Sequence, residues 1–286
     1  MPYLLLCTSI ALSSCRNLLS KRLSSAAFGS RRFFMRQSIL FSGGAAAVLL
    51  LGIGDLRLSS WETLLYGAIY SALLIFAQWF YTAALGHGNT ATCSTVYSMG
   101  FIIPTLSGAI FWSETLSALN VIGIVCAVLA IICSADFKAS CAEKPWNGYL
   151  LLIIAMLSSG GLGIMQKVQQ RSDTADERSA FLLTAFIIAA ALSAACALTR
   201  ERDSLPSARS EAGVALGVGL AFGCCNLLNT ALAGMLPSAV FFPTLNIGTI
   251  LLTTVCGIVL YRERLKRQTL LVLALGAASI LLLAVR

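Results

Sequence analysis

Charged side chains are scarce in this sequence. Only 11% of its 286 residues are Asp, Glu, Lys or Arg, whereas a typical soluble domain has about 25%. The mean hydropathy is +0.85, and 58% of the residues are hydrophobic. So little polar surface excludes an ordinary soluble protein, because water could not cover the remaining apolar surface. The composition predicts an all-α integral membrane protein whose outer surface contacts lipid.

The usual residues of metal and catalytic chemistry are also few. The sequence has one histidine and ten cysteines, with no CxxC pair and no Cys/His spacing typical of a metal site. No GxSxG or HExxH motif is present. We therefore expect no metal, no cofactor and no enzymatic activity. Nine cysteines lie in apolar segments, where a thiol behaves as a small hydrophobic group.

A basic stripe with interleaved aromatic residues is missing too, although the formal net charge is +8. We therefore expect no nucleic-acid partner. Most Lys and Arg residues lie in loops on the side opposite both termini, a bias that would place the termini outside the cell.

Apolar segments long enough to cross a bilayer dominate the rest of the chain. We expect helices at 2–20, 33–52, 62–85, 89–112, 118–135, 146–165, 179–199, 211–234, 237–260 and 267–285. These are ten transmembrane helices, five in each half. The expected organisation is a first repeat over 1–135, a polar linker over 136–147 and a second repeat over 148–286. Short connections predict a compact bundle.

The two halves repeat each other. An offset of 148 residues pairs Gly86 with Gly234 and Gly100 with Gly248. A repeat at about half the chain length indicates that the chain arose by internal duplication. Because each repeat has an odd number of helices, the second enters the membrane upside down relative to the first. Inverted repeats of this kind are typical of secondary transporters, with a site near the middle of the membrane.

A short glutamate turn near the end of each repeat identifies a known family. In the first repeat Pro104 precedes the run WSETL at 112–116, and in the second Gly248 precedes YRERL at 261–265. This pattern, with two five-helix units, resembles the drug/metabolite transporter superfamily of the EamA type. The resemblance implies a single-chain carrier of small metabolites with both termini in the cytoplasm, opposite to the orientation that the loop charges favour. The second copy has no proline at the position of Pro104.

Neutral polar residues are the candidates for the site, because none of the twelve Asp and Glu residues lies in the middle of a span. The first helix has no acidic residue to serve in a family-style proton relay. Amides and hydroxyls in a bilayer must point into the protein. The substrate-binding candidates are Ser13, Ser14, Asn17, Gln78, Tyr81, Tyr97, Ser98, Ser158, Ser159, Asn226, Asn229 and Asn246.

Several of these candidates form pairs. Gln78 and Tyr81 are three residues apart, as are Asn226 and Asn229, so each pair shares one face of its helix. The two pairs are related by the 148-residue offset. The alternative interpretation is contact between helices, worth about 0.6 kcal/mol per hydrogen bond.

Proline and glycine mark candidate hinges. Pro104 removes a backbone hydrogen bond, and Gly248 occupies the corresponding part of the second repeat. Glycine spacing in the eighth helix and the Gly43–Gly44 pair in the second predict close packing of helix backbones.

The prediction is a secondary active transporter that moves a small metabolite, an amino acid-like compound or a drug, by alternating access. We expect a multi-pass protein of the plasma (inner) membrane that acts as a monomer or weak homodimer, with H+ or Na+ as possible coupling ions. The alternatives are a membrane channel and an exporter of drugs or quaternary ammonium compounds. The missing motifs disfavour a membrane-embedded enzyme.

Overall fold

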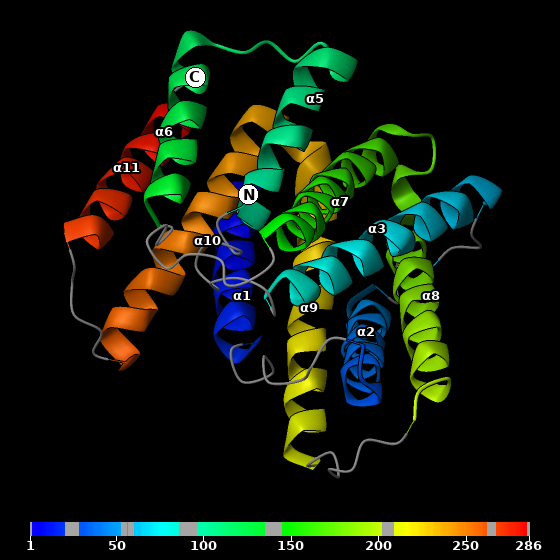
Figure 1. Ribbon diagram of the computed structural model, residues 1–286. Helices are drawn as coiled ribbons and strands as arrows, with labels where there is room; N and C mark the ends of the chain where they lie inside the picture. The colour runs from blue at the N-terminus through cyan, green and yellow to red at the C-terminus, as the bar shows by residue number, and fades with distance from the viewer. Residues whose placement is uncertain are drawn as a thin grey trace. The chain divides into compact units, whose positions relative to one another are not determined.

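The computed structural model describes residues 2–20, 29–52, 56, 60–85, 96–134, 145–201, 209–261 and 267–284. Within these ranges every regular element is helical, and ten α-helices are present (Figure 1). They are α1 (Pro2–Ser20), α2 (Arg31–Gly52), α3 (Trp61–Leu85), α5 (Ile102–Trp112), α6 (Ala118–Ser134), α7 (Pro145–Arg171), α8 (Arg178–Leu198), α9 (Arg209–Met235), α10 (Ser238–Tyr261) and α11 (Arg267–Ala284). Two 3-10 turns, η3 (Met99–Phe101) and η4 (Ala175–Glu177), precede α5 and α8.

The expected helices agree with these elements, with two differences. The fourth expected segment, 89–112, is described only from residue 96, and its regular part is η3 followed by α5. The sixth was expected to end at 165, but α7 continues to Arg171. Its polar end, QKVQQR, contains no glycine or proline to stop the helix. Most of the expected linker and the second glutamate turn, including Glu263, lie outside the described residues.

Six helical segments are long and apolar enough to cross a membrane: Arg31–Gly52, Trp61–Ala84, Leu150–Arg171, Ala175–Leu198, Glu211–Met235 and Ser238–Cys256. Shorter apolar helices cover Val96–Trp112, Ala118–Cys133 and Ala274–Leu283. Large apolar side chains are exposed on them; Ile110 and Phe111 are 72% and 71% exposed. Such exposure suits lipid, because lipid tails impose no hydrophobic penalty. The protein is therefore a helical membrane protein.

The chain forms two compact units, and each combines segments from both halves of the sequence. The α2–α8 unit comprises Leu12–Ile75 and Met165–Gly234, and the α6–α11 unit comprises Met1–Ala11, Phe76–Ile164 and Met235–Arg286. Helix α2 packs along α8 in the first unit, while α6 packs along α11 and α5 along α10 in the second (Figure 1). Each of these pairs joins helices that hold the same place in the two proposed repeats.

Glycines allow α2 and α9 to approach closely in the α2–α8 unit. A Cβ atom on Gly219 would come within 2.1 Å of the Leu40 carbonyl oxygen, and one on Gly223 within 2.5 Å of the Gly44 carbonyl oxygen. From α2, a Cβ on Gly43 would lie 2.8 Å from the carbonyl oxygen of Leu216. The expected close packing is confirmed at these positions. Gly217, in contrast, has open space around it.

In the α6–α11 unit the glutamate turn caps a helix. The Ser238 backbone N–H, at the start of α10, donates to Glu114 Oε2 at 2.7 Å. A carboxylate at this position satisfies a free N–H and interacts favourably with the helix dipole. Ser113 ends α5 in the left-handed conformation, with φ of 51°. In the same unit, Ser279 Oγ donates to the Gly123 carbonyl oxygen at 2.7 Å, joining α11 to α6.

Candidate functional site

Three buried polar side chains from three helices form a hydrogen-bonded network in the α2–α8 unit. The Tyr70 hydroxyl donates to Asn226 Oδ1 at 2.5 Å. Gln166 Nε2 donates to the Tyr70 oxygen at 3.0 Å and to Asn226 Oδ1 at 3.2 Å. The Asn226 amide nitrogen is tied to its own helix, because Nδ2 donates to the Phe222 carbonyl oxygen at 2.8 Å. Tyr70 is 1% exposed, Gln166 is 6% exposed and Asn226 is 5% exposed.

Two residues of the network lie well inside their helices. Tyr70 comes nine residues after Trp61, where α3 begins, and Asn226 nine residues before Met235, where α9 ends. At about 1.5 Å per residue, each is roughly 13 Å from that helix end. Gln166 is nearer an end, five residues before Arg171, where α7 ends. The Tyr70 ring is held by Phe181 of α8, with ring centroids 5.0 Å apart in an edge-on arrangement.

A guanidinium group lies beside the same part of α9. Arg16 Cζ, from α1, is 4.9 Å from the centroid of the Phe222 ring, a cation–π distance. Phe222 is the middle residue of α9, thirteen residues from Arg209 and thirteen from Met235. Arg16 Nη2 also donates to Asn17 Oδ1 at 3.2 Å. A basic residue that the sequence places near the end of the first helix is therefore close to the middle of a span.

The polar end of α7 is largely buried. Lys167 is only 1% exposed and Gln169 is fully buried. Gln169 Nε2 donates to the Thr174 carbonyl oxygen at 2.9 Å, and Gln170 Nε2 to Gln169 Oε1 at 2.6 Å. Sequence reasoning missed Gln166 and Lys167 because their polarity indicated a loop. The one sequence feature that could have indicated their helical position is the absence of glycine and proline between residues 166 and 171, which lets the preceding helix continue.

Five of the twelve sequence-predicted residues lie in the α2–α8 unit. Asn226 belongs to the network, and Asn17 accepts from Arg16. Ser13 Oγ donates to Cys225 Sγ at 3.5 Å. Ser14 is 2% exposed in α1, while Asn229 is half-buried in α9. The structure thus brings Asn226 together with Tyr70 and Gln166, which were not predicted, and joins Ser13 of α1 to the neighbouring Cys225 of α9.

The other seven residues lie in the α6–α11 unit. The rings of Tyr81 and Tyr97 are in contact, with centroids 4.6 Å apart. Asn246 Nδ2 donates to the Phe242 carbonyl oxygen of its own helix at 3.0 Å. The remaining four belong to the same unit; Ser158 is buried, and Gln78, Ser98 and Ser159 are half-buried. Apart from the tyrosine pair, the described contacts do not join these residues into a network like that around Asn226.

The predicted hinge residues both make close contacts in the α6–α11 unit. Pro104 lies in the first turn of α5, just after η3. Its ring packs against α7, because a Cβ on Gly163 would lie 2.7 Å from Pro104 Cγ. A Cβ on Gly248 would lie 2.6 Å from Ile10 Cδ1. Pro243, which the sequence analysis did not select, lies inside α10.

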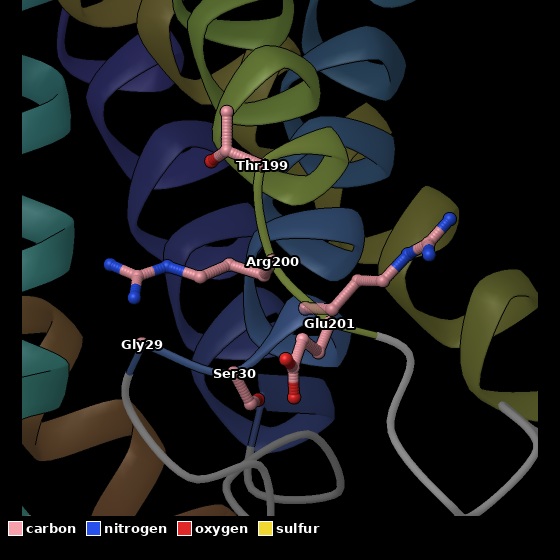
Figure 2. Close-up of a pocket in the computed structure, with 6 residues that line it drawn as sticks. Gly29, Ser30, Thr199, Arg200 and Glu201 are labelled. Carbon is pink, nitrogen blue, oxygen red and sulfur yellow. The ribbon is translucent and has the colours of Figure 1, made fainter.

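A hollow of about 350 Å³ lies where α2 begins and α8 ends. It is lined by Gly29, Ser30, Arg31, Thr199, Arg200 and Glu201. In Figure 2 the Arg200 side chain extends away from that of Glu201, so these two charges do not form one binding group. The hollow is at the ends of its helices, so its position does not suit a site at the middle of the membrane.

Comparisons with known proteins show that solved structures share this fold. No family model matches the chain. No curated protein matches it either. Among solved structures, 29 chains match. One, described as "Crystal structure of protein", superposes with a TM-score of 0.77 at 18% identity, covering 99% of this chain and 98% of the other. At this identity the match shows that the fold is shared over the full length, and shows nothing of function.

Proposed function

We propose that this protein is a secondary active transporter that moves a small metabolite across the plasma (inner) membrane by alternating access. The observation that supports the proposal is the buried network of Tyr70, Gln166 and Asn226, which joins three helices by hydrogen bonds. Polar side chains buried within a membrane protein are costly, and they often mark a substrate or ion pathway. The sequence duplication and the resemblance to the EamA type support a carrier over a channel or an enzyme.

Ten transmembrane helices in two inverted repeats are part of this proposal. The pairing of α2 with α8, α5 with α10 and α6 with α11 supports it, because a pseudo-two-fold axis brings equivalent helices together. In this proposal the shorter helices cross the membrane as well. Amino acid-like compounds and drugs remain the proposed substrates, with H+ or Na+ as the coupling ion.

Counterflow in proteoliposomes tests the proposal. A thermal-shift screen of the purified protein against amino acids, nucleosides, sugars, polyamines and quaternary ammonium drugs first selects a ligand. Vesicles loaded with this ligand should then take up its radiolabelled form above the equilibrium level for a short time. A carrier shows this exchange, whereas a channel shows only dissipation of the gradient. Uptake without counterflow would reject the carrier.

Matched variants connect transport with the network. We expect Asn226→Ala to lower the counterflow rate at least tenfold while the protein still elutes as a folded monodisperse species. Asn246→Ala is expected to lower it as well, because Asn246 is a predicted site residue in α10. Asn120→Ala removes the same amide near the start of α6 and serves as the control. Unchanged kinetics in both Asn226→Ala and Asn246→Ala would remove these residues from the site.

A further inference from the structure

Three charged residues, Arg32, Arg36 and Glu211, join the starts of α2 and α9 in the α2–α8 unit. In this Glu211 cluster, Glu211 Oε2 accepts from Arg32 Nε at 3.0 Å and from Arg36 Nε at 3.2 Å. Both guanidinium groups also donate to the carboxylate through Nη2. Hydrogen bonds between charged groups are roughly twice as strong as those between neutral groups. The cluster therefore ties the two helices together at this end.

The positions of the charges make α2 depend on Glu211. Arg32 lies in the first turn of α2, where positive charge opposes the helix dipole. Glu211 lies in the first turn of α9, where negative charge is favourable. The Arg36 side chain is only 7% exposed, so the loss of the carboxylate would take a negative charge from a nearly buried cation. One carboxylate thus stabilises the starts of both helices.

Beyond the cluster, α2 and α9 are in contact through glycines. Gly219 lies against Leu40 and Gly223 against Gly44, so the residue numbers increase together and the two helices run parallel. Glycines present no side chain that would oppose a shift along the helix axis. The ion pairs do oppose it, because the two arginines of the cluster are one turn apart. Moving α9 by one turn, about 5.4 Å, would leave the carboxylate beside at most one of them.

Helix α9 also carries Asn226 to the polar network. Asn226 lies fifteen residues after Glu211, roughly 22 Å along the helix. Its Oδ1 accepts from Tyr70 of α3 at 2.5 Å and from Gln166 of α7 at 3.2 Å. Because a helix moves as a rigid element, an axial shift of α9 would displace Asn226 from both donors. The Glu211 cluster and the network therefore respond to the same movement.

A chemically different contact joins two helix starts at the other end of the unit. Glu177, just before α8, accepts from the backbone N–H of Ser60 at 2.9 Å and from its hydroxyl at 3.1 Å. This end is opposite to the cluster, because a Cβ on Gly52, where α2 ends, would lie 2.5 Å from Ser179 Oγ in the first turn of α8. In the proposed repeats α3 and α8 correspond to α9 and α2. The two equivalent contacts thus differ: Glu211 binds cations, whereas these bonds of Glu177 are with neutral groups.

We propose that the Glu211 cluster is a latch that holds α9 in the position at which Asn226 joins the network. The latch is closed in the state described here, and it opens during transport so that α9 can move along α2. The inference rests on the proposed transport function and adds a control of that same site. Because the closed latch stabilises one state of the cycle, weakening it makes that state easier to leave.

Hydrogen–deuterium exchange of the purified full-length protein tests whether the latch holds α9. We expect Glu211→Gln to raise amide exchange at least threefold in the first turns of α2 and α9 and also around Asn226, because local opening becomes easier. Glu201→Gln is the matched control, since it removes an exposed carboxylate just after α8, beside the start of α2. It should leave exchange unchanged in all three segments. Parental exchange around Asn226 in Glu211→Gln would overturn the inference.

Arg32→Gln provides a milder variant should Glu211→Gln fail to fold, because the ion pair of Arg36 with Glu211 is kept. It should raise exchange around Asn226 by a smaller factor, and parental exchange there would overturn the inference. The double variant of Arg32→Gln with Glu211→Gln should exchange no faster than Glu211→Gln alone, since both changes break one ion pair. Faster exchange in the double variant would also contradict the latch.

Counterflow of the ligand selected by the thermal-shift screen tests the latch during transport. We expect Glu211→Gln to exchange the ligand at least three times faster than the parent, and Glu201→Gln to exchange it at the parental rate. If the parent shows counterflow and Glu211→Gln is no faster, the transporter stands and the latch is rejected. If the parent shows no counterflow but Glu211→Gln raises exchange around Asn226, the transporter is rejected and the control of the network by the cluster stands.

Discussion

The close approach of α2 and α9 gives a stability prediction with an internal control. Gly219 and Gly217 are two residues apart in α9, but only Gly219 faces the backbone of α2. A Cβ on Gly219 would lie 2.1 Å from the Leu40 carbonyl oxygen, while a Cβ on Gly217 would meet nothing within 4 Å. Since a carbon–oxygen contact needs roughly 3.2 Å or more, Gly219→Ala must move one helix by about 1 Å.

The magnitude follows from two opposing terms. Replacing a helical glycine with alanine stabilises the helix by about 1 kcal/mol, and this gain is common to both variants. Overpacking a tight contact costs about 1–3 kcal/mol. We expect the upper part of this range for Gly219, because the obstacle is backbone and not a flexible side chain. The difference between the variants is then about 2–3 kcal/mol, or roughly 5–10 °C in melting temperature.

Thermal unfolding in one detergent, followed by tryptophan fluorescence, measures this difference. Gly217→Ala should melt at or slightly above the parent temperature, and Gly219→Ala below it. Gly43→Ala, whose Cβ would lie 2.8 Å from the Leu216 carbonyl oxygen, should fall between them. If Gly219→Ala melts as high as Gly217→Ala, then α2 and α9 are not in backbone contact at this position.

Three further predictions test other contacts. Tyr70→Phe should lower the free energy of unfolding by about 1 kcal/mol. The double variant with Asn226→Ala should lose less than the sum of the two single losses, because the two side chains share a hydrogen bond. Additive losses would contradict this contact. Glu114→Ala should lower the free energy of unfolding by about 1 kcal/mol, because α10 loses its cap. Glu114→Gln should lower it less. Equal losses in the two variants would show that Glu114 does not stabilise the protein by capping. Pro104→Ala should slow counterflow several-fold at unchanged melting temperature, and transport at the parental rate would reject the hinge.

Much of the helical fold could be predicted from hydropathy alone. The apolar runs gave helix positions such as 118–135 and 211–234, which agree within two residues with α6 and α9. The prediction worked because a bilayer requires every spanning backbone to satisfy its own hydrogen bonds, so an apolar run of this length has few alternatives to a helix. It was wrong at the end of α7, where the polar residues from Gln166 to Arg171 continue the helix.

The candidate site was predictable only in part. Asn226 was recognised because an amide in an apolar run is conspicuous. Tyr70 was not, since a tyrosine in an apolar run also suits ordinary packing. Arg16 lies near the end of the first expected helix and Lys167 just beyond the end of the sixth, and neither was among the predicted site residues. Their positions depend on which helices pack together, and hydropathy carries no information on that packing.

Helix α9 connects the packing of helices with the polar network in the α2–α8 unit. Its small residues, Gly219 and Gly223, contact α2. Its Phe222 contacts Phe186 of α8, with ring centroids 5.7 Å apart, and also supports the Arg16 guanidinium. One turn further, Asn226 joins α3 and α7. Any displacement of α9 that changes the network must therefore slide along α2 at the glycine contacts. Because the glycines present no side chain there, such sliding meets little steric resistance, whereas an alanine at Gly219 would oppose it.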